Sequence, residues 1–448
     1  MSAIQHLSLR KSFLALAGLA LVLALVALIA KNDSSVASAS DPDPATSVII
    51  LSGDGMGIQQ RTAIQYALYG LDERQPMDAL PYTGFLDTIS LGPGATTDSA
   101  AGATAWAIGE KTINGYTGLG PDKVRVPTLL DIAKEQGKTT ALINDHDVTN
   151  ATLASFGGPV ENRDWKSTIA KKEIHNGKVD ILMGGNEAYW YPAGNPGMIP
   201  NTNKQGEDKS EGRQGNLVEA AIDQGYQYAY DKDTVAALTG PKVLALVQDS
   251  AKRRWIETKG YKFKEDPHYV PVKDMVVKAL EIAGQNPNGF FMAMESDDLD
   301  SAGHEHDVRN VIQSGQTMNQ VVAAIQEYRQ TNPNVLVIVT ADHETGGMTI
   351  EDWDKEETNT NSDGDDPIPY WGKKARNNAG PKGQVPRRSG PVTIKGTDRK
   401  FKVDWTTPEH TGGMVPVTAV GPNAEEMVGV WPNTHVFDVA KKTLLGTP

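Results

Sequence analysis

The sequence contains no cysteine, and this absence excludes three kinds of chemistry. A disulfide framework, a thiolate metal site and a cysteine nucleophile all need the missing side chain. Basic residues are in deficit, with 43 Lys and Arg against 56 Asp and Glu and a net charge of −13. A protein that coats duplex nucleic acid is therefore excluded, because it needs a basic face. Any metal must be held by His, carboxylate and hydroxyl groups.

Long hydrophobic runs are also scarce, which excludes a polytopic membrane protein. The one such run, Phe13 to Ala30, follows Arg10 and Lys11 and precedes the small residues Ala37-Ser38-Ala39. This order predicts that residues 1–39 are a signal peptide and that the mature protein enters a bacterial periplasm or the exterior. The alternative is an uncleaved anchor, because a run of 18 residues lies at the lower limit for a membrane span.

The rest of the chain, residues 40–448, alternates short apolar β-branched runs with helical stretches. Such runs are buried on both faces of a parallel sheet, so we expect one α/β domain with a doubly wound, mostly parallel central sheet and helices on both faces. Two helices are predicted to begin with Pro, at 127–136 and 271–283. The predicted strands are Ser47–Leu51, Thr139–Asn144, Val179–Met183, Val243–Val247, Phe290–Met294 and Val335–Thr340.

Two stretches interrupt this alternation, near 186–213 and 353–405, and they predict loop insertions above the carboxyl ends of the strands. The second stretch contains the acidic segment Glu356–Asp366. A solvated loop is favoured there over a calcium site, because no complete D-x-D-x-D-G pattern is present.

Acidic residues and histidines gather where the predicted strands end. Ligands of open α/β sheets bind beyond the carboxyl ends of the strands, so this gathering predicts a metal cluster. Taken singly, each motif is more often a turn, a helix cap or a solvated pair. Their joint placement favours the metal site. The residues are Asp54 after the first strand, Asp145–Asp147 after the second, Glu295, Asp300 and His304 after the fifth, and Asp342-His343 after the sixth.

The spacing of Asp300 and His304 supports this interpretation, since residues four apart share one face of a helix. His306 would then point elsewhere. Oxygen and nitrogen ligands without sulfur suit zinc or magnesium, and Asp54 could bridge two ions about 4 Å apart.

Ser99 is the candidate nucleophile. It stands at the predicted start of a helix made of very small residues, where free N–H groups and the helix dipole favour an anion. The alternative is that Asp98 or Ser99 only caps the helix. No G-x-S-x-G motif is present, so a serine hydrolase of the nucleophile-elbow type is disfavoured.

At these residues the sequence resembles the bacterial alkaline phosphatases. The motifs that carry the resemblance occur in the family's order between Ser47 and the end of the chain, and five ordered motifs are far more specific than one. They are G-D-G-M-G at Asp54, T-T-D-S-A-A-G-A-T-A around Ser99, M-E-S-D-D-L-D-S-A-G-H from 294 to 304, T-A-D-H-E-T-G-G at Asp342-His343 and H-T-G-G-M-V-P-V at His410.

The resemblance implies hydrolysis of phosphate monoesters to an alcohol and inorganic phosphate, through a phosphoserine at Ser99. Arg163 would clamp the phosphate. The resemblance also implies a homodimer, although no stretch of the sequence identifies an interface. Two zinc ions and one magnesium ion are implied, with Asp300, His304 and His410 for one zinc, Asp54, Asp342 and His343 for the other, and Asp54, Thr152 and Glu295 for magnesium.

The sequence departs from the family at several positions. Asn150 stands where an Asp or His is usual, Ser301 where a Lys, His or Trp is usual, and Leu153 where Pro is common. The cysteines of many bacterial members are absent. Asn150 and Ser301 would surround the third metal and the phosphate, so they leave the magnesium affinity and the rate of phosphate release open.

Other functions are compatible with parts of the pattern. A phosphodiesterase of the same superfamily would often have Thr as nucleophile, and a sulfatase would have Cys or Ser in a C/S-x-P-x-R context. Asp98-Ser99-Ala100 fits neither well. A non-catalytic exported metal-binding module would not need Ser99 beside Arg163.

Overall fold

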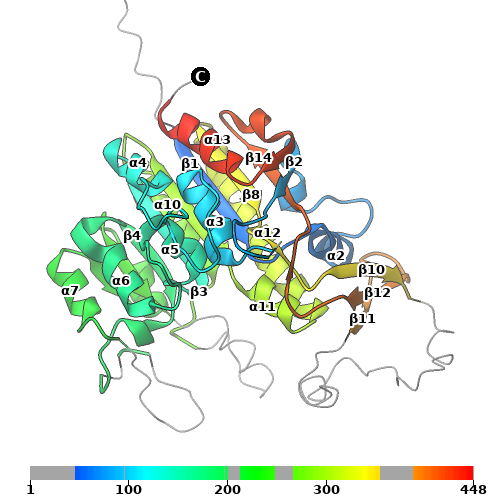
Figure 1. Ribbon diagram of the computed structural model, residues 1–448, viewed down its shortest axis with the longest axis horizontal. Helices are drawn as coiled ribbons and strands as arrows, with labels where there is room; N and C mark the ends of the chain where they lie inside the picture. Colours follow the sequence, from blue (N-terminus) through cyan, green and yellow to red (C-terminus); the bar gives the residue numbers. More distant parts are fainter. Residues whose placement is uncertain are drawn as a thin grey trace, which may run out of the picture. The chain divides into compact units, whose positions relative to one another are not determined.

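A ten-stranded sheet lies at the centre of the described chain (Figure 1). In this computed structural model, the described residues are 46–94, 96–195, 197–199, 212–247, 266–353 and 387–446. Only β14 runs against its neighbours among the described strands of this sheet. The strand order is β15 (Gly429–Pro432), β2 (Tyr82–Asp87), β14 (Val415–Val420), β8 (Val335–Thr340), β1 (Ser47–Gly53), β7 (Phe290–Ser296), β3 (Thr139–Asp147), β4 (Ile181–Gly185), β6 (Val243–Leu246) and β5 (Gln227–Ala229).

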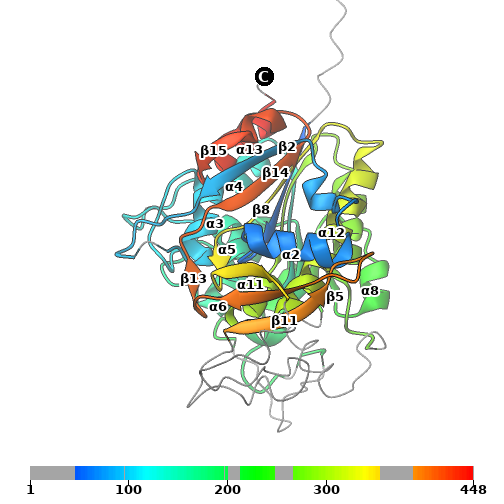
Figure 2. The ribbon, with the colours of Figure 1, turned by 90° about the vertical axis from the view of Figure 1, so that its right-hand side faces the viewer.

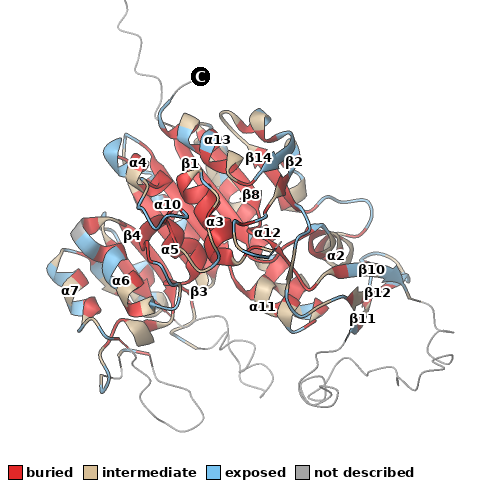
Figure 3. Ribbon diagram, viewed as in Figure 1, coloured by how far each residue is buried: buried red, intermediate tan, exposed pale blue. Residues whose placement is uncertain are grey.

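The sequence prediction of an α/β fold with a mostly parallel sheet is confirmed. The central strands β1, β7 and β8 are buried along their whole length (Figure 3), because helices cover the sheet on both faces. Several predicted strand boundaries differ from the observed ones by one or two residues. The largest difference is in β3, which continues through Asp145 and His146 to Asp147 instead of ending at Asn144. Its register against β4 shifts between Ile143 and Asp147, so the strand is irregular where these polar residues lie.

Helices pack on both faces of the sheet (Figure 2). The first face carries α3 (Ser99–Ile108), α4 (Leu129–Glu135), α5 (Ala151–Gly157) and α13 (His435–Leu444), and the second carries α2 (Ile58–Leu68), α10 (Val272–Ala283) and α12 (Val308–Arg329). The helices predicted at 127–136 and 271–283 are α4 and α10. The remaining described helices are α6 (Lys166–Ile174), α7 (Leu217–Asp223), α8 (Lys232–Ala236) and α11 (Asp298–His304), with short 3-10 turns at Pro76–Asp78, His175–Gly177, Glu187–Tyr189 and Ala424–Met427.

Two small antiparallel sheets follow β8 along the chain. One consists of β10 (Met348–Asp352), β12 (Lys400–Trp405) and β11 (Arg388–Thr393), and the other pairs β9 (Glu344–Thr345) with β13 (His410–Thr411). The stretch 353–405 thus contains two strands as well as loop. The β9–β13 pairing places His410 opposite Thr345, which lies two residues after His343. His410 and β9 are thus neighbours, although 66 positions separate His410 from Glu344, the first residue of β9. 

Some expectations lie outside the described residues. They are the signal segment 1–39 and the acidic segment Glu356–Asp366. In the part of the chain that the structure describes, no helix is both long and apolar enough to cross a membrane.

Candidate active site

The carboxyl ends of β1, β7 and β8 bring three acidic residues together. Strand β1 lies between the other two, and its Ser52 is in register with Glu295 of β7 and with Thr340 of β8. Asp54 and Asp342 each follow their strand by one or two residues, so both reach the same edge of the sheet as Glu295. All three are buried, with exposed fractions of 1%, 0% and 0%. Parallel neighbours therefore create the acidic centre that the strand ends predicted.

Ser99 is the first residue of α3 and is buried against this centre. Asp98 caps the helix, since its carboxylate accepts a hydrogen bond of 2.9 Å from the Ala101 N–H. The Ser99 Oγ lies 3.2 Å from Nε2 of His343. A Cβ added at Gly102 would come within 2.8 Å of the Asp342 carbonyl oxygen, so the small residues of α3 are needed for this close approach.

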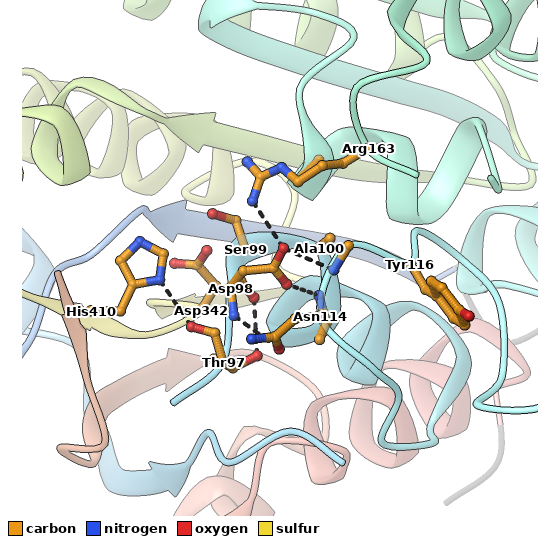
Figure 4. Close-up of polar contacts among 12 residues, drawn as sticks. Thr97, Asp98, Ser99, Ala100, Asn114, Tyr116, Arg163, Asp342 and His410 are labelled. Atoms are coloured by element: carbon orange, nitrogen blue, oxygen red, sulfur yellow. Dashed lines mark hydrogen bonds and ion pairs between the residues drawn. The ribbon is translucent and has the colours of Figure 1, made fainter. Parts of the chain in front are cut away.

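Arg163 reaches the same place from the loop before α6 (Figure 4). Its Nη1 lies 3.3 Å from Asp98 Oδ2, and its Nη2 donates to Asn150 Oδ1 at 3.3 Å. Burial disfavours the charge of Arg163, but Asp98 and Asp54 outweigh burial and raise its pKa. The guanidinium is therefore a fixed cation beside Ser99 and could bind two oxygens of a phosphate.

The first candidate metal group, the histidine group, consists of Asp300, His304 and His410. His304 Nε2 lies 3.1 Å from Asp300 Oδ2 and 3.2 Å from His410 Nε2, and His410 Nε2 lies 3.5 Å from Asp300 Oδ1. The Nδ1 atoms donate elsewhere, that of His304 to the Pro408 carbonyl and that of His410 to the Thr97 carbonyl. This leaves both Nε2 atoms as inward-facing ligand atoms.

The carboxylate and the imidazoles of the histidine group stabilise one another's charged forms. The hydrogen bond with Asp300 raises the pKa of His304 to about 9. Burial opposes the ionisation of Asp300, but hydrogen bonds from His304 and His410 outweigh it and hold the Asp300 pKa well below its usual range. The group is therefore a paired carboxylate and imidazolium set until a cation replaces the protons.

The second candidate group, the shared group, consists of Asp54, Asp342 and His343. Ligand atoms of the three residues lie within 4.8 Å of one another. His343 Nε2 lies 3.4 Å from Asp54 Oδ1 and 3.2 Å from Asp342 Oδ2. Burial and the neighbouring His410 lower the pKa of His343 well below its usual range, so its imidazole is neutral, as a metal ligand must be.

The third candidate group, the carboxylate group, consists of Asp54, Glu295 and Asp297, whose ligand atoms also lie within 4.8 Å. Both oxygens of Asp54, Oε1 of Glu295 and the Thr152 hydroxyl find no hydrogen-bond partner among the described residues. Burial and neighbouring carboxylates raise the pKa of Asp54 and of Glu295 well above the usual range. Buried carboxylates without donors fit a bound cation, which would compensate their charge.

All ten predicted site residues meet at this edge of the sheet, and the structure adds one acid to the expected third set. Thr152 lies beside Glu295, as its effect on the Glu295 pKa shows, and Asp297 has a carboxylate oxygen within 4.8 Å of those of Asp54 and Glu295. The sequence reasoning missed Asp297. Spacing gave no signal for it, because Asp297 follows the end of β7 with helical backbone angles, where the alternation of strand side chains no longer applies.

Two other residues from the sequence analysis, Asp145 and His306, lie outside the three metal groups. Asp145 accepts hydrogen bonds from the Ser296 hydroxyl at 2.7 Å and from the Asp297 N–H at 2.9 Å, so it anchors the end of β7. His306 points elsewhere, as expected, and stacks on Trp405 with ring centroids 5.0 Å apart.

Comparison with known proteins agrees with this geometry. The alkaline phosphatase family model matches residues 45–445, and the chain belongs to this family. Alkaline phosphatase 3 of Bacillus subtilis is 27% identical over 94% of this chain and 96% of its own length. The cold-active alkaline phosphatase of a psychrophilic Shewanella has a similar structure, with a TM-score of 0.68, 26% identity, and coverage of 89% of this chain and 99% of that one.

A third relative carries a metal. A variant of the alkaline phosphatase from the Antarctic bacterium TAB5 has been solved with Mg bound in its M3 site. It shares the fold, with a TM-score of 0.64, 23% identity, and coverage of 90% of this chain and 99% of that one.

Proposed function

We propose that this alkaline phosphatase is an exported, metal-dependent enzyme that hydrolyses phosphate monoesters through a covalent phosphoserine at Ser99. The observation that supports the proposal most strongly is the position of Ser99, buried at the start of α3 with its Oγ 3.2 Å from His343 Nε2 and with the Arg163 guanidinium nearby (Figure 4). A site that only stores metal needs neither a buried hydroxyl nor a guanidinium. Export rests on the segment 1–39, and residues 40–448 would be one catalytic domain.

The start of α3 suits a phosphate for two reasons. The N-terminal end of the helix dipole favours an anion, and Arg163 offers parallel N–H donors from the opposite side. Asp98 holds Arg163 and caps α3 at once, so a single carboxylate orients both parts of the phosphate site. We expect the phosphoryl group to sit between Ser99 and Arg163.

The residues present fit the metals that the family resemblance implies. We propose zinc for the histidine group and for the shared group, whose imidazole nitrogens suit it, and magnesium for the carboxylate group, which offers only oxygen. Such ions, when bound, lower the pKa of a coordinated hydroxyl or water and stabilise negative charge on phosphoryl and leaving oxygens.

The reaction would then proceed in two displacements. The Ser99 Oγ loses its proton and attacks phosphorus, the bond from phosphorus to the ester oxygen breaks, and the alcohol leaves. Water next attacks the phosphoserine, the bond to Ser99 breaks, and inorganic phosphate leaves with the serine hydroxyl restored. Arg163 stabilises charge on the non-bridging oxygens in both steps.

Replacement of Ser99 tests this proposal. Ser99→Ala should lower the hydrolysis of p-nitrophenyl phosphate by at least about 10³-fold while the zinc content and the melting temperature stay near those of the unmodified protein. Ser314→Ala, a buried serine in α12, is the matched control and should retain activity. Retained turnover in Ser99→Ala would refute the nucleophile.

Substrate class is tested with the same preparation. The unmodified enzyme should hydrolyse p-nitrophenyl phosphate faster than bis-p-nitrophenyl phosphate. A faster diester reaction would instead indicate a phosphodiesterase of the same superfamily.

A further inference from the structure

We propose that Asp297 is an additional ligand of the third cation, beside Asp54, Glu295 and Thr152, and that Asn150 and His146 orient Asp297 without binding the ion. This inference rests on the proposed metal-dependent function. It concerns the position at which this sequence departs from its family, where an amide replaces the usual Asp or His. 

The side chain of Asn150 already makes hydrogen bonds with both its oxygen and its amide nitrogen. Its Oδ1 accepts from the Ala151 N–H at 2.8 Å, from Arg163 at 3.3 Å and from Lys166 Nζ at 3.3 Å. Its amide nitrogen donates to Asp297 Oδ1 at 2.7 Å. A flipped amide would face three donors with its NH2 group, so the hydrogen-bond network fixes this orientation. Asn150 thus presents N–H groups, and not oxygen, toward the carboxylate group.

Asp297 lies close enough to Asp54 and Glu295 to bind the same cation. It directly follows β7 and is the residue before α11, so it lies at the same strand end as Glu295. One carboxylate oxygen of each residue lies within 4.8 Å of the other and of Asp54. Asp297 is 8% exposed, and therefore water supplies little compensation for its charge.

Unpartnered oxygens beside Asp297 favour a bound cation at this place. Asp54 is 1% exposed and Glu295 is 0% exposed, and Oδ1 and Oδ2 of Asp54 and Oε1 of Glu295 have no hydrogen-bond partner among the described residues. The Thr152 hydroxyl, also buried, is in the same condition. Leaving such groups unpaired is costly, and a divalent cation would satisfy them together. Ligands that are all oxygen favour Mg2+ over Zn2+.

Both acidic ligands on β7 and its extension are oriented by side chains from β3 and the turn after it. Asn144 donates to Glu295 Oε2 at 2.6 Å, as Asn150 donates to Asp297 Oδ1. His146 Nδ1 lies 3.2 Å from Asp297 Oδ2. An oxygen that accepts one hydrogen bond keeps a lone pair for a metal, and ligating carboxylates are commonly held in this way. Asn150 is therefore a positioning residue.

Magnesium binding to the purified, zinc-loaded protein tests the proposal. Asp297→Asn should weaken Mg2+ binding, measured by equilibrium dialysis and elemental analysis, by at least about tenfold, the lower end of the loss seen for partners of metal ligands. Asp298→Asn replaces the adjacent buried acid, which belongs to none of the three groups, and should bind Mg2+ like the unmodified protein. Unchanged Mg2+ affinity in Asp297→Asn, with intact zinc content, overturns the proposal.

A measurement on the unmodified chain keeps the test decisive if a variant does not fold. Crystals soaked in Mn2+ should show an anomalous peak within ligand distance of Asp54, Glu295 and Asp297. A peak that excludes Asp297, a peak ligated by the Asn150 amide oxygen, or no peak beside Glu295 would each overturn the proposal. These readouts do not use catalysis, so failure here is distinguishable from failure of the phosphoserine proposal, which Ser99→Ala tests by itself.

Discussion

The histidine group and the carboxylate group lie at the same edge of the sheet but differ in how their negative charge is compensated. In the histidine group, the side chains of His304, His410 and Asp300 are 36%, 18% and 14% exposed, and the imidazoles pair with the carboxylate. In the carboxylate group, Asp54 and Glu295 are 1% and 0% exposed and repel each other. The imidazoles of the first group can carry the compensating positive charge themselves, whereas the charge of the second group is offset by a bound cation or by protonation of its carboxylates.

This difference follows from the elements that supply the residues. The histidine group is assembled from α11 and β13, which lie outside the sheet and reach solvent. The carboxylate group is assembled at the ends of strands buried on both faces. Buried strand ends can hold several acids only if a metal or partial protonation offsets their repulsion. The comparison therefore separates a group that is compensated by its own imidazoles from one whose buried acids must be compensated by a cation or by bound protons.

Asp54→Asn should have the largest effect on this comparison, because Asp54 belongs to both the shared group and the carboxylate group. We expect kcat/KM for p-nitrophenyl phosphate to fall by at least about 100-fold. Elemental analysis should show losses of both zinc and magnesium, while the zinc of the histidine group remains. Asp274→Asn, an exposed acid on α10, is the control and should change neither quantity. Full metal content in Asp54→Asn would contradict the bridging role.

His410→Ala should separate the two groups. His410 belongs to the histidine group and touches none of the three residues of the carboxylate group in the described contacts. The zinc content should fall by about one ion per chain, whereas Mg2+ binding should stay. His435→Ala, which changes a partly buried histidine of α13, should leave the zinc content unchanged. An unchanged zinc content in His410→Ala would remove His410 from the ligand set.

Chelation should produce a smaller, pH-dependent effect on stability. In metal-free protein, the raised pKa values of Asp54 and Glu295 mean that the folded state binds protons that the unfolded state releases above about pH 4. Stability then falls as the pH rises. The raised pKa of His304 adds stability that is complete below about pH 6.5 and is lost as the pH rises through about 9. Both contributions therefore have the same sign.

Thermal melts with and without EDTA measure this effect. The chelator should lower the melting temperature by roughly 5 °C near about pH 9 and by less near about pH 6. Asp300 does not reverse this trend, because its depressed pKa keeps it ionised throughout that range. An equal shift at both pH values, or none, would contradict the dependence of the carboxylate group on its cation.

Much of the fold could be predicted from local patterns. The apolar runs that became β1, β3, β4, β6, β7 and β8 are buried on both faces, and continuous hydrophobicity is what such strands require. The strands β2, β5, β14 and β15 of this sheet were not predicted. Strands β5 and β15 have only three and four residues, β2 alternates buried and exposed residues, and β14 contains Pro416, so none of them has the pattern of a long parallel strand.

The residues of the candidate site also divide into those that local sequence patterns predict and those that only the fold reveals. Asp54, Glu295, Asp342 and Ser99 could be predicted because each lies at the end of a strand, within two residues beyond it, or at the start of a helix, and such positions are visible in sequence. The contribution of Asp297 could not be assigned from spacing alone, because it depends on which way Asn150 and Asp297 face one another across 147 positions.

The sequence by itself determined the α/β class, the order of the catalytic motifs and the residue types available for metal, because hydrophobic periodicity and the absence of cysteine are local properties. Only the tertiary structure decided which acids lie close enough to share a cation. Parallel pairing of β1 with β7 and β8 sets the distances between carboxylates, and the β9–β13 pair brings His410 beside His343, with ring centroids 3.6 Å apart. Electrostatic interactions depend on distance and burial, and neither exists until the chain has folded.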